Sequence, residues 1–241
     1  MKPRLLLLHG ALGAGPQLRP LAAALSDSFD VHVPDFEGHG ATPRRGRPFR
    51  IEHFAENVLE FLERTSPGPA HYFGYSMGGY VALYLATVRP ELVLSVATLG
   101  TKFRWSADTA ERDATALDTE RIRAKVPRFA AALAERHVAA GWETVLAETA
   151  GMMRALGERP LLDAATLATI AAPVRICVGD RDATVGIDES AEAYRALRAG
   201  ELEVLPGTPH PFEKAPLARL ARTLTEFYAR PAPPPGENAR G

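Results

Sequence analysis

Short apolar runs alternate with longer amphipathic segments over most of the chain. The apolar runs predict strands at residues 4–8, 29–33, 70–76, 92–100, 173–180 and 201–205. The segments between them predict helices at residues 16–28, 51–65, 77–90, 188–200 and 213–229. Strands that are apolar on both sides and separated by helices indicate a parallel sheet that is covered on two faces. The pattern therefore predicts an α/β fold with a mostly parallel sheet of about six strands and helices on both faces.

The alternation stops between residues 102 and 169, where no strand is predicted. This stretch is rich in Ala, Glu and Arg at helical spacing. We expect residues 1–101 and 170–230 to form the core domain, with residues 102–169 inserted as a helical cap. The insert could be a lid or a purely structural set of helices, and a lid is favoured because α/β proteins bind ligands at the carboxyl edge of the sheet. Residues 231–241 are Pro-rich without apolar anchors, which predicts a disordered tail.

Composition narrows the class of protein more than its function. The chain has 241 residues, 46% hydrophobic and 24% charged, so it can bury a large core without disulfides. A net charge of -1 gives no basic field that would attract nucleic acid or an anionic membrane. The first apolar run is too short for a signal peptide, and no segment approaches the ~20 apolar residues that span a bilayer. We expect a soluble cytoplasmic protein, a monomer or a homodimer, with Cys177 as a packed core thiol.

A G-x-S-x-G motif at residues 74–78 lies where a predicted strand turns directly into a predicted helix. The motif alone is a weak signal, but its position strengthens it. A tight turn there would hold Ser76 in a strained backbone conformation with its hydroxyl exposed. The alternative is that Ser76 only caps the helix while the glycines allow close packing. The position favours a nucleophilic serine.

A serine hydroxyl needs a neighbouring base to attack at neutral pH. His210 lies on a loop between the last predicted strand and the last helix, whereas His137 lies on the insert and is expected to be solvated. The base in turn needs a carboxylate, and the loop after the fifth predicted strand offers Asp180 and Asp182. We favour Asp182, because two more residues carry it towards the His210 loop, and expect Asp180 to cap its own turn. The predicted catalytic triad is Ser76, Asp182 and His210.

With these motifs in this order, the chain resembles the α/β-hydrolase superfamily, in particular its small lidded serine esterases. The motif "HG" follows the first strand, and "DFEGHG", "GYSMGG", "GDRD" and "PHPFEK" come after it in the family's order and spacing. The resemblance spans nearly the whole chain. It implies a serine hydrolase that cleaves small-molecule carboxylic esters through an acyl-enzyme intermediate, with no cofactor. It also implies that the backbone N–H groups of Ala11 and Met77 form the oxyanion hole. No metal site is predicted, because the sequence has no H-E-x-x-H motif and no clustered Cys and His residues.

The chain departs from the family pattern in two places. A β-hairpin usually precedes the "HG" strand, but here "HG" stands at residues 9 and 10, so we expect the sheet to lack that hairpin. The family's "GHGxS" reads "GHGAT" with Thr42, in a loop that is mainly structural. Tyr80 stands where a related menaquinone-pathway lyase usually carries Arg, which weakens that assignment.

Four apolar side chains are candidates for an acyl pocket under the lid. Core packing is equally consistent with each of them. They are Phe36, Trp105, Met152 and Met153.

Several other functions remain open. Thioesterases, lactonases, acyltransferases and carbon–carbon bond hydrolases use the same triad, and some proteins of this fold bind a ligand and signal without catalysis. Dinucleotide binding is a local alternative, because "HGALGAG" follows a strand and Asp35 ends the next one near the expected ~20-residue spacing. The glycine order there is G-x-x-G-x-G, however, and that alternative leaves Ser76, Asp182 and His210 unexplained.

Overall fold

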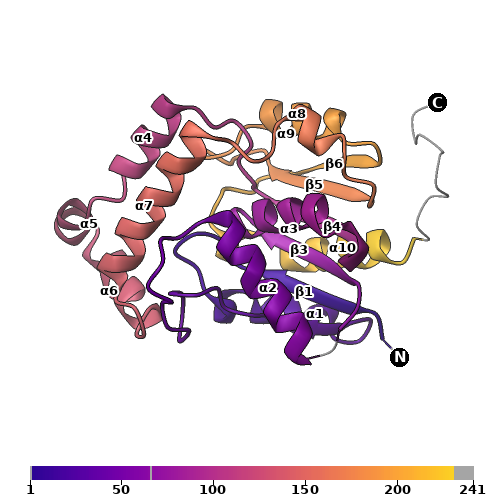
Figure 1. Cartoon of the computed structure of the whole chain (residues 1–241), viewed down its shortest axis with the longest axis horizontal. Coiled ribbons are helices and arrows are strands. Elements are labelled where there is room, and N and C mark those ends of the chain that lie inside the picture. Colours follow the sequence, from indigo (N-terminus) through magenta and orange to yellow (C-terminus); the bar gives the residue numbers. More distant parts are fainter. Residues whose placement is uncertain (1, 66, 231–241) are drawn as a thin grey trace.

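The computed structural model describes residues 2–65 and 67–230, and the predicted tail at 231–241 lies outside them (Figure 1). Its strands form one sheet in the order β2-β1-β3-β4-β5-β6, and every neighbouring pair is parallel. The strands are β1 Arg4–Leu8, β2 Asp30–His32, β3 Ala70–Tyr75, β4 Val93–Leu99, β5 Val174–Gly179 and β6 Gly200–Leu205. The predicted six-stranded α/β sheet is confirmed, and no strand precedes β1 in the described residues.

Helices cover the sheet on both faces. Successive side chains of a strand point to opposite sides, so an apolar strand needs helices on both faces to bury them. On β1, Leu5 and Leu7 pack with α1 and α10, while Leu6 and Leu8 pack with α2 and α3, and all four leucines are fully buried. These helices and the one that packs on β5 and β6 are α1 Arg19–Leu25, α2 Ile51–Thr65, α3 Met77–Val88, α9 Ile187–Ala196 and α10 Leu217–Tyr228.

Prolines shorten two of the predicted helices. The helix expected at residues 16–28 is a 3-10 turn, Gly15–Leu18, followed by α1, in which Pro20 lies in the first turn. The last helix likewise begins only after Pro216. A proline has no backbone N–H to donate, so it is tolerated in the first turn of a helix but not in its interior.

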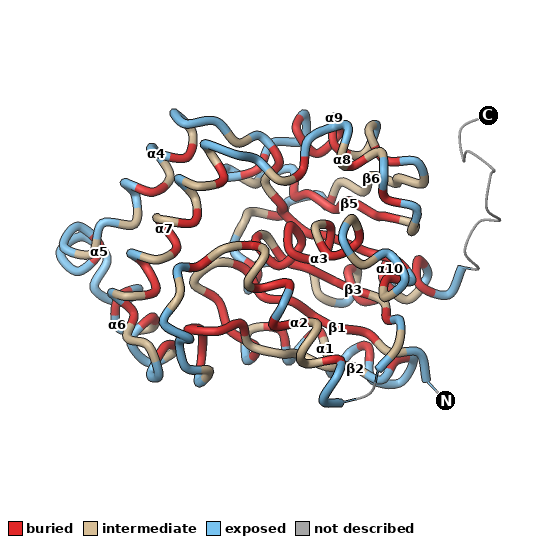
Figure 2. Tube along the Cα trace, in the orientation of Figure 1, coloured by how far each residue is buried: buried red, intermediate tan, exposed pale blue. Residues whose placement is uncertain are grey.

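Four helices follow β4 and lie together at one end of the sheet, at the left of Figure 1. They are α4 Ala107–Thr115, α5 Thr119–Lys125, α6 Pro127–Arg136 and α7 Trp142–Glu158, and we call them the inserted helices. A short helix, α8 Ala164–Leu167, then leads into β5. Figure 2 shows buried residues concentrated in the strands and α3, whereas α5 is mostly exposed. The inserted helices have a small apolar cluster of their own around Leu133, Trp142 and Leu146.

The two outer strands of the sheet carry charged residues. The edge strand β2 has three residues, and its His32 Nε2 lies 3.0 Å from Asp30 Oδ2. On the opposite edge, Glu201 and Glu203 of β6 face Arg175 of β5, whose Nη2 donates to Glu201 Oε2 at 2.6 Å. No helix in the described part of the chain is long and apolar enough to cross a membrane.

Candidate active site

Ser76 lies in a sharp turn between β3 and α3. Its backbone has φ 51° and ψ -116°, in the left-handed half of the map that residues with side chains rarely adopt. Glycines make the turn possible, because a Cβ on Gly74 would lie 2.2 Å from the backbone nitrogen of Gly79. A Cβ on Gly78 would lie 2.2 Å from the carbonyl oxygen of Leu8. The strained conformation expected for this serine is therefore present, and Ser76 lines a cavity.

His210 contacts one of the two candidate carboxylates. Its Nδ1 lies 2.7 Å from Oδ2 of Asp182, and the other oxygen of Asp182 accepts the backbone N–H groups of Thr184 and Val185 at 2.8 and 2.9 Å. The carboxylate is thus fixed by its own loop and only 3% exposed. Contact with an acceptor-only carboxylate places the His210 proton on Nδ1, which leaves Nε2 free to accept a proton.

Asp180 has a different partner. Its Oδ1 accepts the backbone N–H of Thr208 at 3.2 Å, which joins the loops after β5 and β6. Asp180 therefore supports the loop that carries His210. Of the two acids, Asp182 is the one placed against the imidazole.

The His210 loop is hydrogen-bonded to Tyr75, the last residue of β3 and the residue before Ser76. The hydroxyl of Tyr75 donates to the carbonyl oxygen of His210 at 2.9 Å, and the two rings lie 5.4 Å apart. Gly100, at the end of β4, leaves room for the acid–histidine pair, because a Cβ there would lie 3.1 Å from Asp182 Oδ2 and 3.2 Å from His210 Nδ1. The ends of four strands, β3 to β6, thus hold these side chains at the carboxyl edge of the sheet.

The turn after β1 passes directly beside Ser76. The N–H of Gly13 donates to the carbonyl oxygen of Gly10 at 3.0 Å, and a Cβ on Gly10 would lie 3.2 Å from Ser76 Cβ. Ala11, the next residue, lines the same cavity as Ser76. Met77 also lines it and is the first residue of α3, where backbone N–H groups have no acceptor within the helix. The two residues implied as oxyanion donors therefore line the same cavity as the serine.

The imidazole of His9 forms a hydrogen bond with this turn. It is fully buried, and burial lowers the pKa of its imidazole to about 4, so the ring is neutral. Its Nε2 accepts the N–H of Phe36 at 3.2 Å, which leaves Nδ1 to donate to the carbonyl oxygen of Gly10 at 2.9 Å. Phe36 stacks on Phe54 at 4.8 Å and is 1% exposed. Phe36 therefore lies in the core and does not line the cavity beside Ser76.

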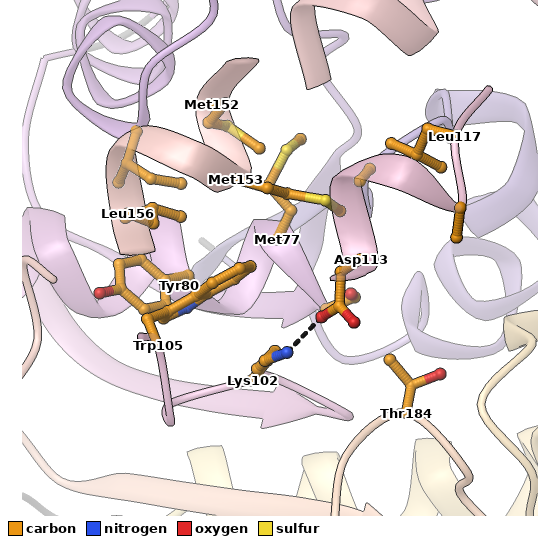
Figure 3. Close-up of a pocket in the computed structure, with 14 residues that line it drawn as sticks. Met77, Tyr80, Lys102, Trp105, Asp113, Leu117, Met152, Met153, Leu156 and Thr184 are labelled. Carbon is orange, nitrogen blue, oxygen red and sulfur yellow. Dashed lines mark hydrogen bonds and ion pairs between the residues drawn. The ribbon is translucent and has the colours of Figure 1, made fainter. Parts of the chain in front are cut away.

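The cavity beside Ser76 has a volume of about 330 Å³ and is lined partly by α4 and α7 of the inserted helices (Figure 3). Trp105, Met152 and Met153 line it, as the sequence suggested. Tyr80 also lines it, and its hydroxyl accepts the N–H groups of residues 161 and 162. Further lining residues are Ile51, Lys102, Asp113, Ala116, Leu117, Leu156 and Thr184.

An ion pair in the cavity wall was missed from the sequence. Lys102, just after β4, points towards Asp113 of α4 and forms an ion pair with it (Figure 3). The ammonium also lies 4.7 Å from the centre of the Trp105 ring. Both charged side chains are largely buried. They lie eleven residues apart in the sequence. No sequence motif predicts this pair, because only the packing of α4 over the cavity brings the two side chains together.

Two other expectations concern residues outside the lining of this cavity. His137, expected to be solvated, is fully buried against the turn after β1, so that expectation is wrong. Asp35, the candidate ribose ligand, accepts the N–H of Gly15 at 2.5 Å and so stabilises its own loop. Among the described residues no cluster of three or more His, Cys, Asp and Glu could hold a metal ion.

Sequence comparison identifies related proteins over part of the chain. A sequence model of the family described as "alpha/beta hydrolase fold" matches residues 3–156. The chain is 34% identical over 106 residues to a pimeloyl-[acyl-carrier protein] methyl ester esterase of Chromobacterium violaceum, covering 44% of this chain and 40% of that protein. It is 37% identical over 89 residues to the magnesium-chelatase 30 kDa subunit of Rhodobacter capsulatus, covering 36% and 31%. The chain thus spans less than half the length of these relatives.

Solved structures match nearly the whole chain. The crystal structure of NosK from Streptomyces actuosus is similar with a TM-score of 0.80 and 25% identity, covering 95% of this chain and 98% of that one. The enol-lactonase from Burkholderia xenovorans LB400 is similar with a TM-score of 0.78 and 20% identity, covering 95% and 92%. At this identity the enol-lactonase likeness establishes the shared fold alone.

Proposed function

Because the chain belongs to the alpha/beta hydrolase fold family, we propose that it is a serine hydrolase that cleaves carboxylic esters through an acyl-enzyme intermediate. One arrangement carries the proposal. Ser76 lies in a strained turn beside a largely apolar cavity. His210, whose imidazole contacts Asp182, accepts a hydrogen bond at its backbone carbonyl from the residue before this serine. A strained nucleophile, a fixed base and an acid that orients the base are the parts that acyl transfer needs.

In the proposed first step, Ser76 Oγ attacks the ester carbonyl carbon while His210 Nε2 takes the hydroxyl proton. Asp182 stays ionised and stabilises the imidazolium that forms. The N–H groups of Ala11 and Met77 donate to the oxygen that becomes negative, an interaction worth about 2.7–4 kcal/mol per donor in a preorganised site. The alcohol then leaves with the proton from His210.

In the second step, water replaces the alcohol. His210 Nε2 takes a proton from the water, the hydroxide attacks the acyl carbonyl, and the carboxylic acid leaves as the proton returns to Ser76 Oγ. The proton of Ser76 thus leaves on the alcohol and one from the water replaces it, so Ser76 and His210 regain their starting protonation states, and no cofactor enters the sequence of steps.

The cavity favours a modest apolar acyl group. Met152, Met153 and Leu156 of α7 and Trp105 supply flexible apolar surface, so we propose that the inserted helices act as a cap over the acyl chain. Relatives that are named methyl ester esterases support an ester with a small alcohol. Thioesters, lactones and acyl transfer to another alcohol use the same intermediate, and a substrate series distinguishes them.

The test uses p-nitrophenyl esters of two to ten carbons and a fluorophosphonate that labels activated serines. The wild type should hydrolyse the shorter esters and be labelled at Ser76, and Ser76→Ala should do neither while keeping its thermal unfolding temperature. A folded wild type that neither reacts with the probe nor hydrolyses any ester contradicts the proposal. A Ser76→Ala protein that keeps its full biological effect would instead favour a ligand-binding signalling role.

A further inference from the structure

The end of α6 reaches across to the turn after β1. His137 Nε2 lies 3.0 Å from the carbonyl oxygen of Leu12, and Arg136 Nη1 donates to the same oxygen at 2.7 Å. On its other side, His137 Nδ1 accepts the backbone N–H of Gly40 at 3.2 Å. Since that N–H can only donate, Nδ1 carries the lone pair and Nε2 carries the proton. The ring is neutral, fully buried, and bonded on both sides to backbone.

The carbonyl held in this way belongs to a strained residue. Leu12 has φ 59°, a left-handed conformation that is strained for a residue with a side chain. It is the third residue of the turn closed by the hydrogen bond from Gly13 to Gly10. Glycine usually fills that position when φ is positive. Relaxation of Leu12 to negative φ would rotate its carbonyl away from both donors, so the two hydrogen bonds oppose relaxation.

Ala11 shares this turn, and its N–H lies in the same peptide plane as the Gly10 carbonyl that accepts the N–H of Gly13. The direction of that N–H depends on the turn keeping its shape, because Ala11 lies between Gly10, which packs against Ser76, and Leu12, whose oxygen is held. No contact between His137 and the lining of the cavity is needed for this effect. The residue acts through the backbone.

We propose that His137 is a positioning residue for the oxyanion hole: from the inserted helices it holds the Leu12 carbonyl and so keeps the Ala11 N–H directed at the reacting oxygen. This inference rests on the proposed function. It means that the oxyanion hole is complete only while α6 is docked on the turn. The cap then has two roles, to enclose the acyl group and to complete the hole.

Two isosteric substitutions separate the two hydrogen bonds of His137. The amide nitrogen of Gln reaches about as far as imidazole Nε2, whereas the amide of Asn reaches only as far as Nδ1. His137→Gln should therefore keep the donor to Leu12, and His137→Asn should lose it. We expect His137→Asn to lower kcat about ten- to a hundredfold with little change in KM, while His137→Gln retains most of the activity.

A second substitution tests the link to backbone strain. Glycine adopts positive φ without strain, so Leu12→Gly needs less support from His137. The loss of kcat caused by His137→Asn should therefore shrink severalfold in the Leu12→Gly background. If His137→Asn fails to fold, Arg136→Met removes the second donor at a half-buried site, and its kcat should fall by a smaller factor that Leu12→Gly also reduces.

The outcomes are distinct when kcat, KM and thermal unfolding are measured for each variant. Equal kcat in His137→Asn and His137→Gln, or an undiminished loss in the Leu12→Gly background, overturns the positioning role and leaves the hydrolase intact. A drop in unfolding temperature without a change in kcat does the same. A wild type that neither hydrolyses esters nor reacts with the fluorophosphonate overturns the proposed function and this inference with it.

Discussion

The Nδ1 atom of His210 lies 2.7 Å from Oδ2 of Asp182, although the two residues are 28 positions apart and belong to different loops. The contact fixes which imidazole nitrogen carries the proton. It also brings a buried negative charge to the place where an imidazolium would form during acyl transfer. The neighbouring acid, Asp180, is only two residues away but bonds to backbone instead.

Replacement of Asp182 by Asn should nearly abolish hydrolysis. The amide has lost the negative charge, and its NH2 group favours the wrong histidine tautomer, so kcat should fall by about 10⁴. Steady-state hydrolysis of a p-nitrophenyl ester measures the effect. Asp180→Asn is the matched control and should reduce kcat far less, since Asp180 only supports a loop. Similar losses in both variants would refute the assignment of roles.

Gly100→Ala should impair catalysis beyond its effect on stability. The residue has φ 62°, and the new Cβ would lie 3.1 Å from Asp182 Oδ2 and 3.2 Å from His210 Nδ1. Those distances require the acid–histidine pair to shift by a few tenths of an ångström, and we expect kcat to fall about tenfold.

Gly46→Ala is the control for Gly100→Ala. Gly46 has a comparable φ of 69° but nothing within 4 Å of the added Cβ, so it carries backbone strain without crowding. Both variants should lose about 1 kcal/mol of unfolding free energy in urea titrations. Only Gly100→Ala should lose activity; a normal kcat in that variant would mean that the pair tolerates the methyl group.

Asp113→Asn should change which acyl groups are preferred. The substitution leaves the Lys102 ammonium in an apolar cavity without its counter-charge, so an acyl chain that ends in a carboxylate should gain relative to a neutral one. We expect the ratio of kcat/KM for the charged and neutral acyl esters to rise about fivefold, corresponding to ~1 kcal/mol. Lys102→Met should lower the same ratio. Asp108→Asn, at an exposed position on α4, should leave the ratio unchanged.

Buried histidines should make the fold sensitive to acid. Burial lowers the pKa of His71 to about 4, from an ordinary value of 6.5. The unfolded chain therefore binds more protons than the folded one between pH 6.5 and 4. The free energy of unfolding falls with decreasing pH in that window, by at most about 1.4 kcal/mol per pH unit from this residue. Above pH 6.5 the contribution is fully present.

His71→Asn tests the acid sensitivity away from the candidate active site. The Asn amide can replace the imidazole Nδ1, which lies 2.8 Å from Ser95 Oγ, but it does not titrate. Urea unfolding at several pH values should show a shallower pH dependence in the variant than in the wild type. Equal slopes would mean that His71 titrates normally in the folded protein.

Local sequence patterns were sufficient to predict the sheet and part of the candidate active site. Each strand is an apolar run bounded by helical patterns, and the strand–serine–helix turn is specified by adjacent residues, so both could be predicted. The preference for Asp182 over Asp180 matches the contact in the structure because loop length alone limits which acid reaches His210. The rest of the candidate active site depends on how the inserted helices pack against the core of the fold.

The positions of several side chains could not be predicted from local sequence patterns, because they depend on how distant segments pack together. His137 ends a helix rich in Ala, Glu and Arg, which indicated a solvated position, but docking of α6 on the turn after β1 buries it completely. Phe36 and Trp105 are both aromatic residues in loops, and only the packing of Phe36 on Phe54 separates a core residue from a cavity residue. Lys102 and Asp113 meet for the same reason, through tertiary contacts alone.

The charged outer strands of the sheet bear on how the protein behaves at high concentration. An exposed strand edge is a template for pairing with another molecule, and such pairing leads to aggregation. Here β2 offers only three residues, with Asp30 and His32 among them, and β6 carries Glu201 and Glu203. An incoming strand would have to cover these charges at either edge. The charged residues on β2 and β6 thereby guard both edges of the sheet against strand-to-strand association.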